Sequence, residues 1–182
     1  MKYITAFLFA TVLAVSVSGC GVDENTSDQR LQQSEVRHNY QRFKLEQKFA
    51  QTAKQKALVE RARDSVEYHR AQAIMFAHSK GYNAEHGDGW EAMLDTLSRE
   101  ALREYVRLQR NLSHAREWQV RKLGVLNHYL GQYQFDEHKF ESWYAKNVKN
   151  RDNPVIHASQ LADSLNNTDL WRLAEQKTQS DR

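Results

Sequence analysis

Apolar and small residues recur at helical spacing along a stretch, from about residue 34 to 79, that holds neither glycine nor proline. Apart from one step of five, from Ala57 to Ala62, steps of three, four or seven residues keep them close to one helix face, near the heptad pattern of a coiled coil. The positions are Val36, Tyr40, Phe43, Ala50, Ala57, Ala62, Val66, His69, Ala73 and Phe76. With a rise of about 1.5 Å per residue, the pattern predicts a helix about 70 Å long.

A second seam of the same kind follows a short glycine-rich stretch. Asp88 as N-cap, with Glu91 three positions later, predicts that this helix begins near Trp90. The seam comprises Leu94, Leu97, Ala101, Tyr105, Leu108, Leu112, Ala115, Leu123, Leu126, Leu130 and Tyr133. A short turn between two such seams predicts an antiparallel hairpin with arms of matched length.

The phase of the second seam shifts between Trp118 and Leu123, and Gly124 follows directly. A phase shift beside a glycine predicts a local irregularity or kink in this helix.

Shorter helices are predicted after the second seam. Asp136 can cap a third helix, and Asn153 before Pro154 supplies the start signals of a fourth. The pair at 166–167 breaks the fourth helix before a final one over 168–177. The apolar face of the third helix comprises Phe140, Trp143, Tyr144 and Val148. With 1 Pro and 7 Gly in 182 residues, the composition predicts an all-α fold: an elongated antiparallel helical hairpin with shorter C-terminal helices packed on it.

The N-terminal residues have the layout of a secretory signal. Lys2 precedes an apolar stretch that ends at about Val15, shorter than the roughly 20 residues of a membrane-spanning helix. Residues 20–33 are polar and without hydrophobic period, so we predict that they form a flexible tether. Residues 34–182 are predicted to form a single helical domain.

The sequence Val17-Ser18-Gly19-Cys20 resembles the lipobox of bacterial lipoprotein precursors: an aliphatic residue, two small residues and a cysteine. The resemblance implies cleavage between Gly19 and Cys20, which makes residues 1–19 the signal peptide. It also implies a diacylglyceryl group on the Cys20 sulfur and a further acyl chain, such as palmitate, on the new amine. Gly21, in place of the Asp that retains such lipoproteins in the inner membrane, implies an outer-membrane location facing the periplasm. A disulfide at Cys20 would require another chain, because the sequence holds 1 Cys.

We predict no enzymatic activity and no catalytic residue. The segment Glu85-His86-Gly87-Asp88 gathers an acid and a base, but no nucleophile motif accompanies it, and its composition is typical of an exposed turn. Glu137 and Glu141 lie four positions apart on one helix face. This spacing is typical of solvated charges, here balanced by Lys139 and Lys146, rather than of a glycosidase pair.

The eight histidines leave a metal- or haem-binding helical bundle open as an alternative. Di-iron bundles use two Glu-x-x-His units, and only Glu35-x-x-His38 has that spacing here. Met75 and Met93 flank the hairpin turn, where either could join a histidine as a haem ligand, although methionine at helical spacing is more often core filling. We predict neither a metal site nor a bound cofactor.

The formal net charge of +3, without a dense basic stripe, argues against nucleic-acid binding. Trp90 and Trp171 are candidate partner contacts, whereas Trp143 shares a face with Phe140 and Tyr144 and is predicted to lie in the core. These features predict a lipid-anchored, non-enzymatic accessory factor that binds another envelope protein. Such a factor would act in secretion, conjugation or entry exclusion. The seams could close within one chain or form a homodimer.

Overall fold

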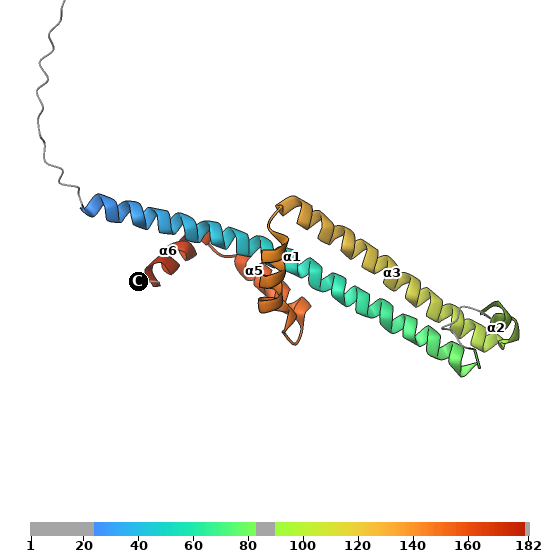
Figure 1. The fold of residues 1–182 in the computed structure, drawn as a ribbon. Helices are drawn as coiled ribbons and strands as arrows, with labels where there is room; N and C mark the ends of the chain where they lie inside the picture. The colour runs from blue at the N-terminus through green and yellow to red at the C-terminus, as the bar shows by residue number, and fades with distance from the viewer. Residues whose placement is uncertain (1–23, 83–89, 181–182) are drawn as a thin grey trace, which may run out of the picture.

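A computed structural model describes residues 24–82 and 90–180, and every regular element in these ranges is helical (Figure 1). This confirms the all-α prediction. In chain order the elements are α1 (Glu24–Ser79), α2 (Trp90–Thr96), α3 (Arg99–Tyr133), α4 (Glu137–Tyr144), the π-helix η2 (Ala145–Lys149), α5 (Pro154–Asn166) and α6 (Leu170–Ser180).

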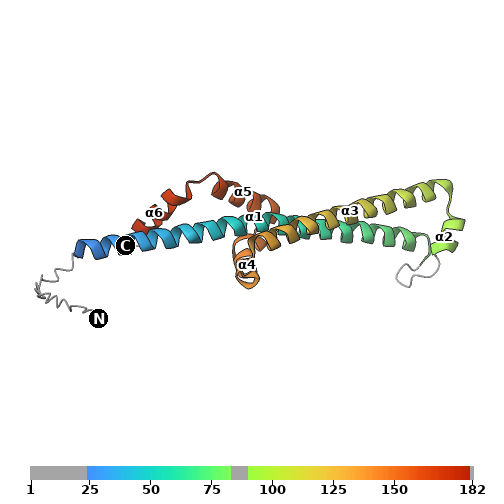
Figure 2. The same ribbon diagram turned by 90° about the horizontal axis from the view of Figure 1, so that it is seen from above.

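Helix α1 is the rod against which α3, α5 and α6 pack (Figure 2). Helix α3 returns antiparallel along the C-terminal part of α1, while α5 lies along its middle and α6 along its N-terminal part. The elongated hairpin with shorter C-terminal helices is therefore confirmed. The arms are not matched, however, because α1 has 56 residues and α3 has 35.

Helix α1 begins at Glu24, ten residues before the predicted start near Ser34. Residues 24–33, predicted as part of the tether, are thus helical, and residues 26–33 are exposed. They contain no glycine or proline, and residues 29–33 are good helix formers, which can extend a helix that packing has nucleated without burying apolar surface themselves. The remainder of the predicted tether lies outside the described residues.

Alanines line much of the buried face of α1. Those with at most 4% exposure are Ala50, Ala53, Ala57, Ala62, Ala73 and Ala77. Such short side chains let neighbouring helices approach closely, because the interaxial distance depends on the side chains at the contact.

Helix α3 is continuous from Arg99 to Tyr133, so the irregularity or kink predicted near Gly124 does not interrupt the helix. The steps of three and four continue from buried Ala115 through Gln119 and Lys122, which are both half-buried. The long aliphatic stems of these polar side chains can cover apolar surface while their ends reach water. Leu123, taken as a seam position, is instead 45% exposed.

The helix predicted from Trp90 to Tyr133 is divided at Ser98. Its Oγ accepts a hydrogen bond from the Ala101 backbone N–H at 3.3 Å and so caps α3. The predicted cap at Asp88 lies outside the described residues. At the other side of the turn, Gly81 lies two positions after the end of α1 at Ser79, and its φ of 83° is a conformation that glycine adopts without steric cost.

The main apolar core lies midway along α1, where α4, η2 and α5 meet it. Its buried members are Phe49, Ala53, Ala57, Phe140, Tyr144, Val148 and Ala158. Trp143 packs against this cluster, as predicted, with its ring centroid 5.5 Å from that of Phe49. The predicted face of the third helix is confirmed, and the π turn of η2 keeps Val148 on the same side as Tyr144.

Polar contacts at the rim of this core fix α4. The predicted caps are confirmed: Asp136 accepts from the Lys139 N–H, and Asn153 accepts from the Ile156 N–H. Glu141 pairs with Lys56 of α1 at 2.5 Å, so the expectation that lysines of its own helix balance it is wrong.

Candidate partner-binding groove

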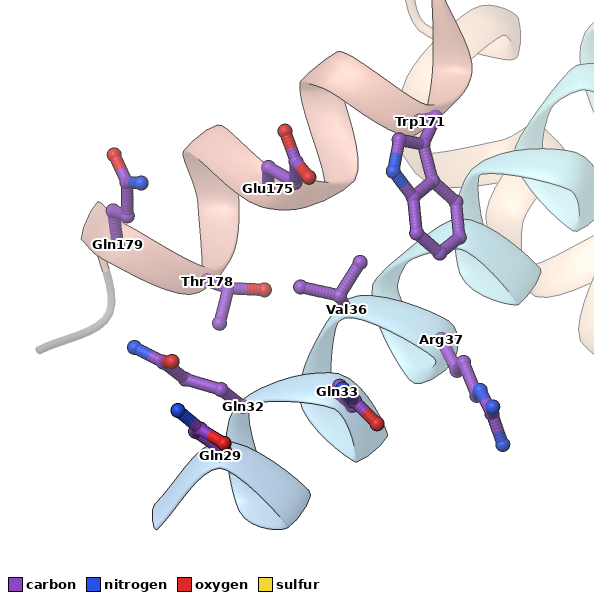
Figure 3. A pocket seen from close by; sticks show the side chains of 9 residues that line it. All are labelled: Gln29, Gln32, Gln33, Val36, Arg37, Trp171, Glu175, Thr178 and Gln179. Atoms are coloured by element: carbon purple, nitrogen blue, oxygen red, sulfur yellow. The ribbon is translucent and has the colours of Figure 1, made fainter. Parts of the chain in front are cut away.

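A groove of about 520 Å³ runs between the first turns of α1 and the facing side of α6 (Figure 3). Its lining residues are Gln29, Gln32, Gln33, Val36 and Arg37 from α1, and Trp171, Glu175, Thr178 and Gln179 from α6. The two segments are far apart in the sequence, and the fold brings them side by side.

Helix α6 is started and oriented by local chemistry. The Asp169 side chain accepts a hydrogen bond from the Arg172 N–H at 3.2 Å, which satisfies one of the free donors at a helix start. Ala174 and Thr178, four positions apart, are the buried residues of this helix. Their spacing places them on one face, so α6 packs on α1 along a narrow line.

A buried hydrogen bond fixes the rotation of α6 about its axis. The Asn39 Nδ2 group donates to the Thr178 Oγ1 at 2.6 Å, and the Thr178 hydroxyl donates to the Ala174 carbonyl at 2.9 Å. Asn39 is 9% exposed and Thr178 is 6% exposed. In the described part of the chain, no buried side-chain polar atom lacks a hydrogen-bond partner. The floor of the groove is therefore held by satisfied, directional contacts.

Trp171 is the large aromatic residue of the groove. Its ring meets the Tyr40 ring edge to face, with centroids 5.3 Å apart and an interplanar angle of 70°. The side of the indole not covered by Tyr40 leaves the residue 45% exposed. In Figure 3, Trp171 and Val36 both extend into the space between the two helices. An aromatic held on one side and exposed on the other is the kind of residue that anchors protein interfaces.

The remaining lining residues are mostly polar. Gln29, Gln32 and Gln33 are exposed primary amides, each of which can donate and accept hydrogen bonds. These are the two capacities that match the N–H and C=O groups of an extended polypeptide. Arg37 and Glu175 add one charge of each sign. None of the nine lining residues is a histidine or a cysteine.

The two predicted tryptophan contacts do not share a surface. Trp90 is the first residue of α2, at the opposite end of α1 from α6, and its side chain is not described (Figure 1). Trp171 alone of the two lies in the groove. Gly19 and Cys20, together with the segment 85–88, lie outside the described residues.

The candidate metal and haem ligands are dispersed. Within the described ranges, no group of three or more His, Cys, Asp or Glu side chains is placed to hold a metal ion. Met93 is fully buried, Met75 is 62% exposed, and His38 is exposed. Among the described helices, none combines the length and the apolar character needed to cross a membrane.

The glutamines of the groove were missed because exposed glutamines form no motif. One signal was present: Asn39 lies three positions after Val36 and four before Phe43, so it is a polar residue at a seam position. A buried polar side chain requires a partner, and Asn39 therefore indicated that a polar group from another element must reach this face. No protein-family model, curated protein or solved structure matches the chain.

Proposed function

We propose that this protein is a lipid-anchored, non-enzymatic envelope protein that binds a segment of another envelope protein in the groove between α1 and α6. The lipid is carried on Cys20, and the protein faces the periplasm from the outer membrane. The observation that carries the proposal is the position of the groove, whose first lining residue, Gln29, is nine positions from Cys20.

A lipid on Cys20 would hold the groove close to the membrane surface. Helix α1 rises about 1.5 Å per residue, and an extended chain spans at most about 3.6 Å per residue. The four residue steps from Cys20 to Glu24 and the five from there to Gln29 thus cover on the order of 20 Å. A partner in the groove would lie next to the bilayer that holds the anchor.

The lining supports a polypeptide ligand. Trp171 and Val36 provide apolar contact for a side chain, and the three glutamine amides match backbone groups on either side of it. Trp171 loses little side-chain entropy when a partner binds, because its ring already packs against that of Tyr40.

Site-specific photo-crosslinking in intact cells tests this proposal. A photoreactive residue at Gln33 should crosslink one defined envelope protein, identified by mass spectrometry. The same residue at Arg61, an exposed position of α1 outside the groove, should not. Trp171→Ala should abolish the Gln33 crosslink, whereas Tyr68→Ala, which removes another exposed aromatic, should leave it unchanged. Equal crosslinks from both positions, or a crosslink insensitive to Trp171→Ala, would refute the groove as the binding site.

The anchor has its own test. Metabolic labelling with a palmitate analogue should mark the wild-type chain and leave Cys20→Ser unmarked. The signal sequence of the Cys20→Ser chain should also stay uncleaved. A labelled Cys20→Ser chain would show that the lipid lies elsewhere.

A further inference from the structure

The face of α3 that points away from α1 carries exposed aliphatic side chains. Leu108, Leu112 and Ala115 are buried on the side toward α1. At about 100° per residue, Val106 and Val120 lie on the far side of the helix. Val106 is 48% exposed and Val120 is 69% exposed, and Leu102, 40% exposed, lies one turn before Val106.

Arginines flank both aliphatic positions. A shallow hollow of about 330 Å³ is lined by Leu102, Arg103, Val106, Arg107 and Arg110. A second, of about 470 Å³, is lined by Ser113, Arg116, Glu117, Val120 and Arg121. Each hollow thus combines aliphatic surface with several guanidinium groups. We call these two sets of residues together the outer face of α3.

The charge of α3 is strongly basic for its length. Its 35 residues hold seven Lys and Arg against three Glu, a formal charge of +4, while the whole chain carries +3. Among the described residues, the ion pairs made by α3 are Arg107 with Glu104 and His114 with Glu117. Arg103, Arg110, Arg116 and Arg121 therefore have no described carboxylate within 4.0 Å and remain exposed.

We propose that the outer face of α3 docks on the anionic head groups of a lipid bilayer, so that the rod lies along the membrane. Guanidinium groups form bidentate contacts with phosphates, and aliphatic side chains between them can enter the head-group region. Each basic residue near an anionic bilayer strengthens binding by about fivefold. The inference rests on the proposed function for one point, that the anchor keeps the chain at a membrane and so raises the local concentration of lipid.

The alternatives fit the surface less well. A second copy using the same face would place arginines against arginines, which disfavours a homodimer through α3. An acidic partner helix would need a continuous apolar seam at steps of three and four. Such a seam here reads Leu102, Val106, Gln109, Ser113, Arg116, Val120, and so is polar in its centre. A fluid bilayer needs no such register.

A spin label at Val120→Cys tests the docking in the full-length lipoprotein purified from membranes. Acylation of Cys20 would leave the introduced cysteine as the single reactive thiol, so a second label on the chain would reveal failure of the anchor. The protein is placed in vesicles of phosphatidylcholine, or in vesicles in which a third of the lipid is phosphatidylglycerol. Asp64→Cys, an exposed position of α1, is the matched control.

Phosphatidylglycerol should make the Val120 label more accessible to oxygen and less accessible to a nickel chelate, with the Asp64 label unchanged. The difference should disappear at about 0.5 M salt, where charges are screened beyond a few Å. It should also disappear in a variant with glutamine in place of the four arginines Arg103, Arg110, Arg116 and Arg121. Circular dichroism of that variant checks that it is folded.

An identical Val120 accessibility in both vesicle types, with the chain still attached, would overturn the docking and leave the anchor intact. Loss of the chain from both vesicle types would instead count against the anchor. A response that persists in the four-glutamine variant would overturn the assignment to arginine. Protection of the label by a lipid-free envelope extract, and not by phosphatidylglycerol, would replace the bilayer by an acidic protein.

Discussion

The hydrogen bond between Asn39 and Thr178 is expected to decide whether α6, and with it the groove, stays docked on α1. The variant Thr178→Val keeps the shape of the side chain and removes its hydroxyl. The Asn39 amide then loses the acceptor that lies 2.6 Å from its nitrogen, in a site where Asn39 is 9% exposed. A buried donor left without a partner pays its full desolvation cost.

That cost is about 1–3 kcal/mol, which corresponds to roughly a 5- to 150-fold increase in the equilibrium constant for undocking. The effect should be local, because the main packing partner of α6 is α1. Segments with few buried contacts open as separate units, at a lower free energy than global unfolding. Asn39→Leu should cost less, because the Thr178 hydroxyl still donates to the Ala174 carbonyl. The double variant, with both partners apolar, should be close to Asn39→Leu.

Hydrogen exchange measured by mass spectrometry on peptides from α6 gives these constants directly. The amides of α6 should exchange roughly 5- to 150-fold faster in Thr178→Val. The amides of α3 should exchange as in the wild type. The reasoning would be refuted if α6 protection in Thr178→Val stayed within about twofold of wild type. It would also be refuted if the double variant were no better protected than Thr178→Val.

Three further predictions concern stability, measured by urea unfolding followed by circular dichroism. Gly131→Ala should stabilise the fold by about 1 kcal/mol, because alanine favours the helix over glycine and a Cβ there meets nothing within 4 Å. An unchanged or lower stability would contradict this reasoning. Gln134→Gly should stabilise the fold by about 1 kcal/mol, because Gln134 has a φ of 44°, a conformation that is costly for residues with a Cβ. The matched control Gln132→Gly lies inside α3 and should destabilise the fold by about as much. Effects of equal sign in the two variants would contradict this reasoning. Burial, followed by the hydrogen bond from the Tyr144 hydroxyl to Glu60 at 2.7 Å, raises the pKa of Tyr144 above its ordinary 10.0. As the pH rises, the unfolded chain therefore loses this proton first, and above about pH 10 the free energy of unfolding should fall by about 1.4 kcal/mol per pH unit. Tyr144→Phe should remove this contribution to the slope. An unchanged slope in Tyr144→Phe would contradict the assignment to Tyr144.

The parts of the fold that could be predicted are those set by residues close together in the sequence. Asp136 and Asn153 cap their helices as predicted, because a side-chain oxygen at an N-cap needs only the three residues that follow it. The buried face of α4 and η2 was also readable, since Phe140, Tyr144 and Val148 follow helical spacing.

The errors arose where burial and helicity do not follow apolar residues. Gln119 and Lys122 continue the α3 seam with polar side chains, so the apolar pattern led to Leu123, which is exposed. The start of α1 was placed too late for the related reason that residues 26–33 are helical while exposed. Hydrophobic periodicity detects a buried helix face, and the exposed first turns of a long helix have no buried face to detect.

The groove could not be predicted, because its two walls meet only through tertiary packing, and its existence follows from how that packing is made. Ala174 and Thr178 are small enough to bring α6 close to α1 along one line. The first turns of α1 carry polar glutamines, which do not pack over that contact as apolar side chains would. The ring of Trp171 packs against Tyr40. A larger side chain at Ala174, which is fully buried, would push the helices apart and widen or open the groove. The same close contact that stabilises α6 therefore shapes the surface that we propose receives the partner.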